Sequence, residues 1–149
     1  MKTLSKILST CFGLGYIPIA PGTATSLVFV LFYKYFLFSI PWPFFLGILA
    51  VLFFLGVIVS TKYSSDLKMK DPRRITIDEA VGQLLPLFLL PPTWINMGIA
   101  FVLFRFFDIL KPFPIKRTES FPGGWGIMTD DIVAGLYTGI LINFYLLMR

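Results

Sequence analysis

The chain has 149 residues, of which 56% are hydrophobic and only 14% are charged. Soluble domains carry about a quarter charged residues, and the apolar residues here come in long runs. An integral membrane protein is therefore favoured over a soluble helical protein with an unusually apolar core. The net charge of +5 does not indicate nucleic-acid binding, because the basic residues lie between apolar runs rather than along one polar face. A single domain covering residues 1–149 is expected.

The N-terminal segment, residues 1–12, places Leu4, Ile7, Leu8 and Cys11 at helical spacing, with lysines and serines between them. This pattern predicts a short amphipathic helix lying on the membrane surface. The stretch after it, residues 13–23, is rich in glycine and proline and is expected to form a loop. The lone cysteine excludes an internal disulfide framework.

Five apolar runs follow this loop, at residues 24–40, 42–61, 78–90, 93–110 and 130–148. Runs of about 18 residues or more are long enough to cross a bilayer as helices. The third run is shorter, and it forms either a tilted hairpin with the fourth run or one bent span with it. We therefore predict an all-α polytopic membrane helical bundle with four or five hydrophobic helices.

The charges of the connections predict how this bundle is oriented. The loop after the second run and the segment after the fourth are basic, whereas the connections at 39–43 and 91–94 carry no charge. By the positive-inside rule the basic loops are cytoplasmic, and Trp42 and Trp94 lie at the outer interface. Lys34, near the end of the first run, is expected to reach toward the outer head groups.

Carboxylates are the residues best suited to chemistry, because the chain has no histidine. They form three sets, each at the cytoplasmic end of a predicted helix: Asp78-Glu79, Asp108 and Asp130-Asp131. Brought together, these groups would repel one another unless a divalent cation were present, and Mg²⁺ prefers oxygen ligands and bridges readily to phosphate. Helix capping is the alternative explanation for the two pairs, but it does not account for Asp108 at a helix C-terminus. The sequence thus predicts a Mg²⁺ site.

Small and basic residues near these acids support the same interpretation. Gly82 and Gly135 each lie about one turn beyond an acidic pair, where they would let two helices approach closely. Arg105 and Lys111 could each neutralise a phosphate, or Arg105 could pair with Asp108 and leave the lysine solvated. A phosphate-binding turn or an ordinary helix cap would explain four residues at the start of the first run, and on these residues alone the cap is favoured: Pro21, Gly22, Thr23 and Ser26.

Four segments in fixed order carry a resemblance to a known family: residues 13–23 (GLGYIPIAPGT), 78–82 (DEAVG), 104–115 (FRFFDILKPFPI) and 123–135 (GGWGIMTDDIVAG). Together they resemble the phosphatidylglycerophosphatase A family. The resemblance implies Mg²⁺-dependent removal of the terminal phosphate from phosphatidylglycerophosphate, an anionic phospholipid, at the cytoplasmic side of a bacterial inner membrane. It implies the active-site acids Asp78, Glu79, Asp108, Asp130 and Asp131, with Arg105, Lys111 and residues 21–23 as phosphate contacts.

The predicted metal ligands are Glu79, Asp108, Asp130 and Asp131, of which Glu79, Asp108 and Asp131 are the first choices. Asp78 or Asp130 would then either support the ligands from behind or act as the general base. Hydrolysis is expected to proceed by direct attack of water, with an aspartyl-phosphate intermediate as the alternative. Two other classes of protein remain open: a carboxylate-lined membrane cation carrier and a non-enzymatic membrane scaffold. A carrier would need its acids near mid-span, whereas these acids gather at one end of the predicted helices.

Overall fold

The computed structural model describes residues 2–88 and 90–148, and the parts of the predictions that fall on residues 1, 89 and 149 lie outside them. The described residues are helical and contain no strand, which confirms the predicted all-α class. The predicted N-terminal helix is present as α1. In order, the elements are α1 (Lys2–Ser9), the 3₁₀ turn η1 (Leu14–Tyr16), α2 (Pro21–Phe32), the π-helical turn η2 (Tyr33–Leu37), α3 (Trp42–Leu67), α4 (Ile77–Leu87), α5 (Trp94–Leu110), α6 (Ile115–Thr118) and α7 (Gly124–Leu147).

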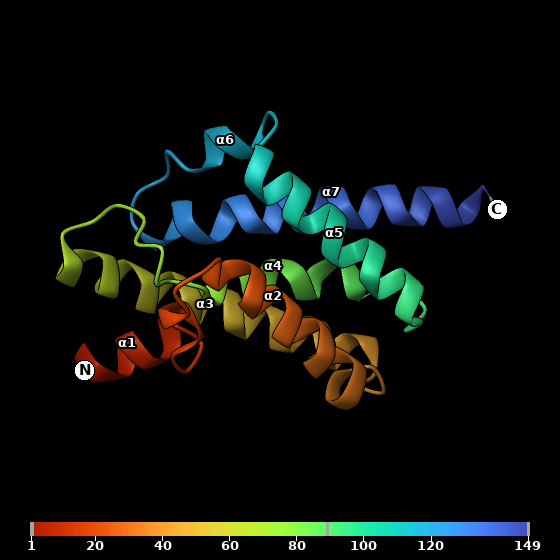
Figure 1. The fold of residues 1–149 in the computed structure, drawn as a ribbon, viewed down its shortest axis with the longest axis horizontal. Coiled ribbons are helices and arrows are strands. Elements are labelled where there is room, and N and C mark those ends of the chain that lie inside the picture. Colours follow the sequence, from red (N-terminus) through yellow and green to blue (C-terminus); the bar gives the residue numbers. More distant parts are fainter. Residues whose placement is uncertain (1, 89, 149) are drawn as a thin grey trace.

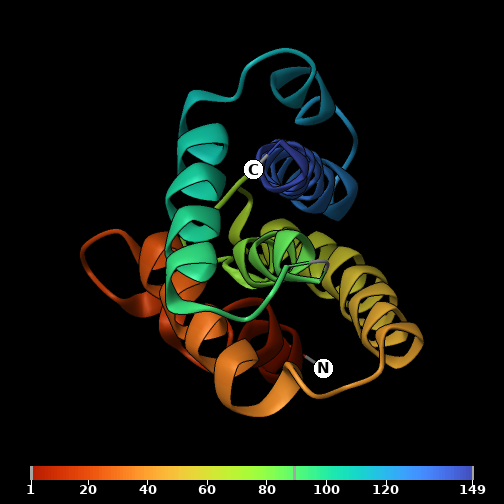
Figure 2. The same ribbon diagram turned by 90° about the vertical axis from the view of Figure 1, so that its right-hand side faces the viewer.

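Helix α4 lies at the centre of the bundle, with α2, α3, α5 and α7 packed around it (Figure 2). Its side chains are buried on nearly every face, from Ile77 to Leu87, which explains why the segment is apolar all round rather than along one stripe. With 11 residues it is only about 16 Å long. The four longer helices therefore enclose α4. Polar side chains from several helices can come together at its N-terminal end.

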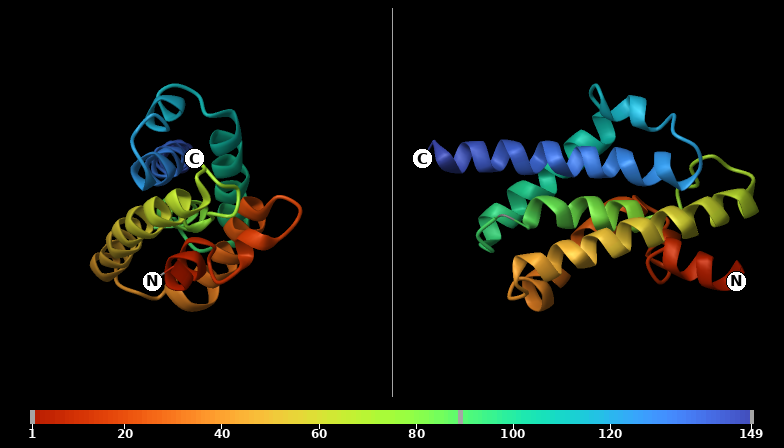
Figure 3. Two further views of the ribbon diagram at one scale, coloured as in Figure 1. Left: turned by 90° about the vertical axis from the view of Figure 1, so that its left-hand side faces the viewer. Right: turned by 180° about the vertical axis from the view of Figure 1, so that it is seen from behind.

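The connections divide between the two ends of the bundle (Figure 1). The uncharged turns before α3 and before α5 lie at the same end as the last turns of α7. The opposite end holds α1, the last turns of α3 and the first turns of α7. The view from behind shows the same division (Figure 3). The structure thus separates the uncharged turns from the basic segments, as the charge pattern predicts.

Lys34 is held at the uncharged end by the turn before α5. Its Nζ donates a hydrogen bond of 2.6 Å to the carbonyl oxygen of Pro92 and lies 5.4 Å from the ring centroid of Trp94. An ammonium over an indole face is a favourable cation–π contact. We call this contact the Lys34 tether; it gives the basic residue of the first apolar run a specific partner.

Two helices are long and apolar enough to cross a membrane by length and composition, α3 and α7. Large apolar side chains are also exposed on α2 and α5, for example Phe32, Val102 and Phe106. Exposed apolar area of this extent marks contact with lipid or a partner. The four or five spans of the sequence prediction are not confirmed by these lengths and stay a prediction.

Two helices begin several residues before the positions that the sequence predicts. Helix α2 begins at Pro21, so residues 21–23 form its first turn and not a loop; proline is favoured at this position because its missing N–H has no partner to lose there. Helix α7 begins at Gly124 rather than at residue 130. The acidic pair of α7 therefore lies inside the helix, and capping does not explain it.

The early start of α7 follows from close packing on α3. A Cβ added at Gly124 would lie 2.1 Å from the carbonyl oxygen of Val57. The Gly124 backbone N–H also donates a 2.7 Å hydrogen bond to Oγ1 of Thr61. Gly124, before the acidic pair, therefore allows α7 to pack closely against α3. From the sequence alone, two consecutive glycines would be expected to form a turn.

Candidate active site

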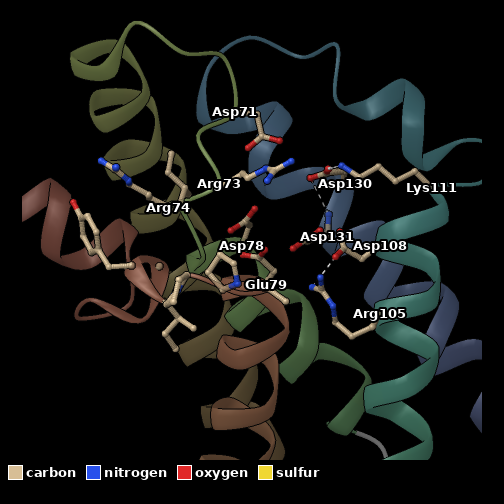
Figure 4. Close-up of a pocket in the computed structure, with 18 residues that line it drawn as sticks. Asp71, Arg73, Arg74, Asp78, Glu79, Arg105, Asp108, Lys111, Asp130 and Asp131 are labelled. Atoms are coloured by element: carbon tan, nitrogen blue, oxygen red, sulfur yellow. Dashed lines mark hydrogen bonds and ion pairs between the residues drawn. The ribbon is translucent and has the colours of Figure 1, made fainter.

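A cavity of about 530 Å³ opens where the N-terminal ends of α2 and α4, the last turns of α5 and the second turn of α7 meet (Figure 4). The segment between α3 and α4 forms another wall. All five predicted acids line this cavity: Asp78, Glu79, Asp108, Asp130 and Asp131. The structure thus brings together carboxylates from three separate parts of the chain.

Three of these acids form the tightest group. One carboxylate oxygen from each of Asp78, Glu79 and Asp131 lies within 4.8 Å of the others. Within the described residues, Oδ1 of Asp78, Oε2 of Glu79 and Oδ2 of Asp131 are buried without a hydrogen-bond partner. Buried carboxylates are normally paired, because an unpaired charge or polar oxygen in the interior is costly. This donor set fits a divalent cation, which would satisfy all three oxygens and remove their mutual repulsion.

The other two acids hold the basic residues of α5. Asp108 Oδ2 is 2.7 Å from Nη1 of Arg105, so the ion-pair interpretation of Arg105 is correct. The solvated lysine expected with it is not found: Lys111 is half-buried and donates to Oδ2 of Asp130, at 2.8 Å, and to Glu119. Oδ1 of Asp130 accepts the backbone N–H of Asp131 at 3.0 Å. Asp108 and Asp130 thus fix two cationic groups beside the three-acid group.

Glycines allow the acid-bearing helices to come this close. A Cβ added at Gly82 would lie 2.7 Å from the carbonyl oxygen of Asp131, and one added at Gly135 would lie 2.5 Å from the carbonyl oxygen of Gly82. The predicted close approach of α4 and α7 at these two glycines is confirmed. Gly22 plays a similar part for α2, since a Cβ there would lie 2.0 Å from Oε1 of Glu79.

The four candidate residues at the start of α2 do not share one environment. Pro21 and Gly22 line the cavity. Ser26 lies a turn further along α2 and is fully buried in the bundle, and neither it nor Thr23 is among the cavity-lining residues. The first turn of α2 therefore contributes backbone to the site, close to the Glu79 carboxylate.

Cys11 lies outside the cavity lining and is buried between α1 and η1. Burial, more than the neighbouring carboxylates, raises the pKa of its thiol to about 12. The thiol therefore stays protonated at neutral pH and is not a nucleophile. This agrees with the choice of carboxylates as the residues that carry the chemistry.

Sequence reasoning missed a charged wall of the cavity in the segment before α4, formed by Arg73 and Arg74 with Asp71 beside them. In Figure 4 the Arg73 side chain extends into the cavity toward Asp130, and no ion pair of Arg73 occurs within residues 2–88 and 90–148. The Arg74 guanidinium lies instead over the ring of Tyr16, 5.2 Å from its centroid. The sequence does contain a basic stretch, KDPRR (residues 70–74), shortly before Asp78-Glu79. Its charges were used only to predict that this loop is cytoplasmic.

The described residues form an all-helical protein with two helices long and apolar enough to cross a membrane, and with a carboxylate-lined cavity that could hold a metal ion beside basic residues. The sequence model of one family, described as phosphatidylglycerophosphatase A, matches residues 7–146. The chain belongs to this family. The match runs from the last turn of α1 almost to the end of α7 and includes every residue of the cavity wall named above.

Three curated relatives are similar over most of their length. A Haemophilus influenzae phosphatidylglycerophosphatase A is 39% identical over 138 residues, covering 91% of this chain and 85% of the relative. The Escherichia coli phosphatidylglycerophosphatase A is 34% identical over 140 residues, covering 93% and 81%. A Bacteroides thetaiotaomicron protein named "Putative phosphatidylinositol-3-phosphatase" is 40% identical over 146 residues, covering 93% and 91%. No solved structure matches the chain.

Proposed function

We propose that this protein is a Mg²⁺-dependent lipid phosphatase that hydrolyses phosphatidylglycerophosphate to phosphatidylglycerol and phosphate. Family membership over residues 7–146 and relatives named for this activity support the reaction. The observation that carries the chemistry is the group of three buried carboxylates whose oxygens lie within 4.8 Å of one another. A carrier is disfavoured, because these acids stand at one end of the bundle and open into a cavity. The whole chain, residues 1–149, is proposed to act as one domain.

The cation is assigned to Asp78, Glu79 and Asp131. The sequence prediction named Glu79, Asp108, Asp130 and Asp131, and the ion pairs favour a different set of ligands. Asp108 and Asp130 are engaged by Arg105 and Lys111, whereas each of the three assigned acids has an oxygen without a partner. A cation held there would supply charge neutralisation for the phosphate and a lower pKa for the attacking water.

The chain's own residues orient the phosphate and remove the proton. Arg105 and Lys111 stand beside the acids and donate to the phosphoryl oxygens, while Asp108 and Asp130 keep them in position. The water's proton passes to a carboxylate. Both oxygens of Asp130 already accept hydrogen bonds, which favours Asp78 as the general base over Asp130. Asp78 needs only one carboxylate oxygen for the cation, so its second oxygen is left for the proton. An aspartyl phosphate remains the alternative intermediate.

The test of this function is phosphate release from short-chain phosphatidylglycerophosphate by the detergent-purified protein. Release is expected with Mg²⁺ and is expected to fall to background when a chelator is added, because the phosphate then faces uncompensated carboxylates. Excess Mg²⁺ added after the chelator should restore the rate, whereas the same ionic strength of NaCl should not. Turnover that persists in chelator would contradict the role given to the three acids.

The bilayer arrangement is also a proposal: four or five hydrophobic helices in a bacterial inner membrane, with the cavity on the cytoplasmic side. The exposed apolar side chains of α2 and α5 and the basic segments at the cavity end support it. Helix α4 would reach only part of the way across.

Cysteine labelling tests this orientation. In a Cys11→Ser background, Ser39→Cys is expected to react with a membrane-impermeant maleimide in spheroplasts. Ser120→Cys is expected to react only after lysis. Both serines are exposed, so access depends on the side of the membrane rather than on burial. The reverse pattern, or reaction of both before lysis, would be incompatible with the proposed topology.

The name of the Bacteroides relative makes phosphatidylinositol 3-phosphate the second candidate substrate. The same phosphate-release assay compares the two lipids directly. A rate with phosphatidylinositol 3-phosphate well above that with phosphatidylglycerophosphate would move the assignment to the inositol lipid.

A further inference from the structure

The two head groups named by the relatives share one piece of chemistry. In phosphatidylglycerophosphate, the lipid phosphodiester and the terminal phosphomonoester are joined through three carbons, and the middle carbon carries a hydroxyl. In phosphatidylinositol 3-phosphate, ring carbons 1, 2 and 3 join the two phosphates in the same way, again with a hydroxyl on the middle carbon. Six bonds separate the two phosphorus atoms in both lipids, so they lie at most about 7 Å apart.

The cavity has room for both phosphates of such a head group. Its volume of about 530 Å³ falls within the range of small-molecule sites, roughly 300–1,000 Å³, and far exceeds the space that one phosphate needs. The site is therefore large enough to bind the part of the head group that lies beyond the scissile phosphate.

The cations of the cavity fall into two sets. Arg105 and Lys111 are half-buried and ion-paired to acids beside the three-acid group, so they serve the phosphate that is hydrolysed. Arg73 comes from another segment, is exposed at the mouth, and has no ion pair in the described part of the chain. Its neighbour Arg74 is occupied by the Tyr16 ring. Arg73 is thus the cation left for a second anion, and a guanidinium suits phosphate oxygens.

On the basis of the proposed phosphatase function, we infer that the site selects lipids whose phosphomonoester lies three carbons from the phosphodiester, and that Arg73 binds the phosphodiester. The rule covers both the glycerol and the inositol head group. It excludes phosphatidylinositol 4-phosphate, where one more carbon intervenes, and phosphatidic acid, which has no phosphodiester. Arg73 is a specificity-determining residue in this scheme and takes no part in bond breaking.

A substrate panel in one detergent tests the spacing. Phosphatidylglycerophosphate and phosphatidylinositol 3-phosphate are both expected to be hydrolysed. The kcat/KM for phosphatidylinositol 4-phosphate and for phosphatidic acid should be about 10- to 100-fold lower, the effect of losing one charged hydrogen bond. Equal hydrolysis of either of these two lipids, or no hydrolysis of phosphatidylinositol 3-phosphate, would overturn the rule while leaving the proposed function intact. Hydrolysis of phosphatidylinositol 3-phosphate without that of phosphatidylglycerophosphate would overturn the proposed function, and the rule with it, because the rule expects both lipids to be hydrolysed.

Product inhibition tests Arg73 separately. Phosphatidylglycerol retains the phosphodiester but lacks the phosphomonoester, whereas inorganic phosphate occupies only the inner position. Arg73→Gln is expected to raise the inhibition constant of phosphatidylglycerol about 10-fold or more and to leave that of inorganic phosphate unchanged. Lys116→Gln, an exposed basic residue of α6 outside the cavity lining, is the charge-matched control and should change neither. An equal rise for both inhibitors in Arg73→Gln, or none for phosphatidylglycerol, rules out the assignment.

Discussion

Replacing Asp131 by asparagine is expected to lower kcat by about 1,000-fold or more while the protein stays folded. The amide keeps the shape of the side chain but removes one of the three carboxylate charges that are proposed to bind the cation. Charged groups positioned to stabilise a transition state commonly contribute effects of this size. The fold should not suffer, because one carboxylate fewer reduces the repulsion within the buried group. The measurements are initial rates with saturating Mg²⁺ and thermal unfolding in detergent.

Asp66→Asn is the matched control for this experiment. Asp66 is exposed in the last turn of α3 and does not line the cavity, so the same chemical change there should leave turnover unaltered. Retention of more than about a tenth of the parent rate by Asp131→Asn would mean that this acid is not a ligand. A rate lost together with the unfolding transition would instead point to a structural role.

The change Gly135→Ala is expected to damage both stability and activity. Its new Cβ would lie 2.5 Å from the carbonyl oxygen of Gly82 and 3.3 Å from Cβ of Leu85, both on α4. Because backbone cannot yield as a flexible side chain does, α7 must move away from α4. Overpacking of this kind costs about 1–3 kcal/mol. The same displacement carries Asp131, one turn earlier, away from Glu79, so the rate at low Mg²⁺ should fall by more than about 10-fold.

Gly139→Ala provides the comparison on the same helix, one turn further along. A Cβ there would meet its nearest atom, Cα of Pro86, at 3.6 Å, an ordinary contact. This variant should match the parent or gain up to about 1 kcal/mol from helix propensity. The readouts are the unfolding midpoint and the Mg²⁺ concentration that gives half-maximal rate. Equal behaviour of the two alanine variants would show that the crossing of α4 and α7 is not tight.

Much of this site could be predicted because membrane sequences restrict where charge can lie. A carboxylate beside an apolar run is conspicuous, so Asp78-Glu79, Asp108 and Asp130-Asp131 stood out, and the glycines next to two of these sets indicated where helices approach. The resemblance carried by residues 13–23, 78–82, 104–115 and 123–135 pointed to the same acids. Family membership confirms that resemblance.

What sequence could not supply was the pairing of these groups. Spacing put Arg105 next to Asp108 on one helix face, but the partners of Lys111 come from other segments, Glu119 and Asp130. Arg73 was hidden for a different reason: loop arginines are expected on any cytoplasmic surface, and nothing local says that one of them faces a cavity. The start of α7 was missed because Gly123 and Gly124 are typical of a turn, whereas tertiary packing keeps Gly124 helical.

The Lys34 tether limits how this protein can admit a lipid. It ties η2, which directly follows α2, to the turn before α5, while the other ends of these two helices carry Gly22 and Asp108, which both line the cavity. If the two helices separate, the separation must then be smallest next to Lys34 and largest at the cavity. On this geometry a head group would enter at the cavity end of the two helices and not between their tethered ends.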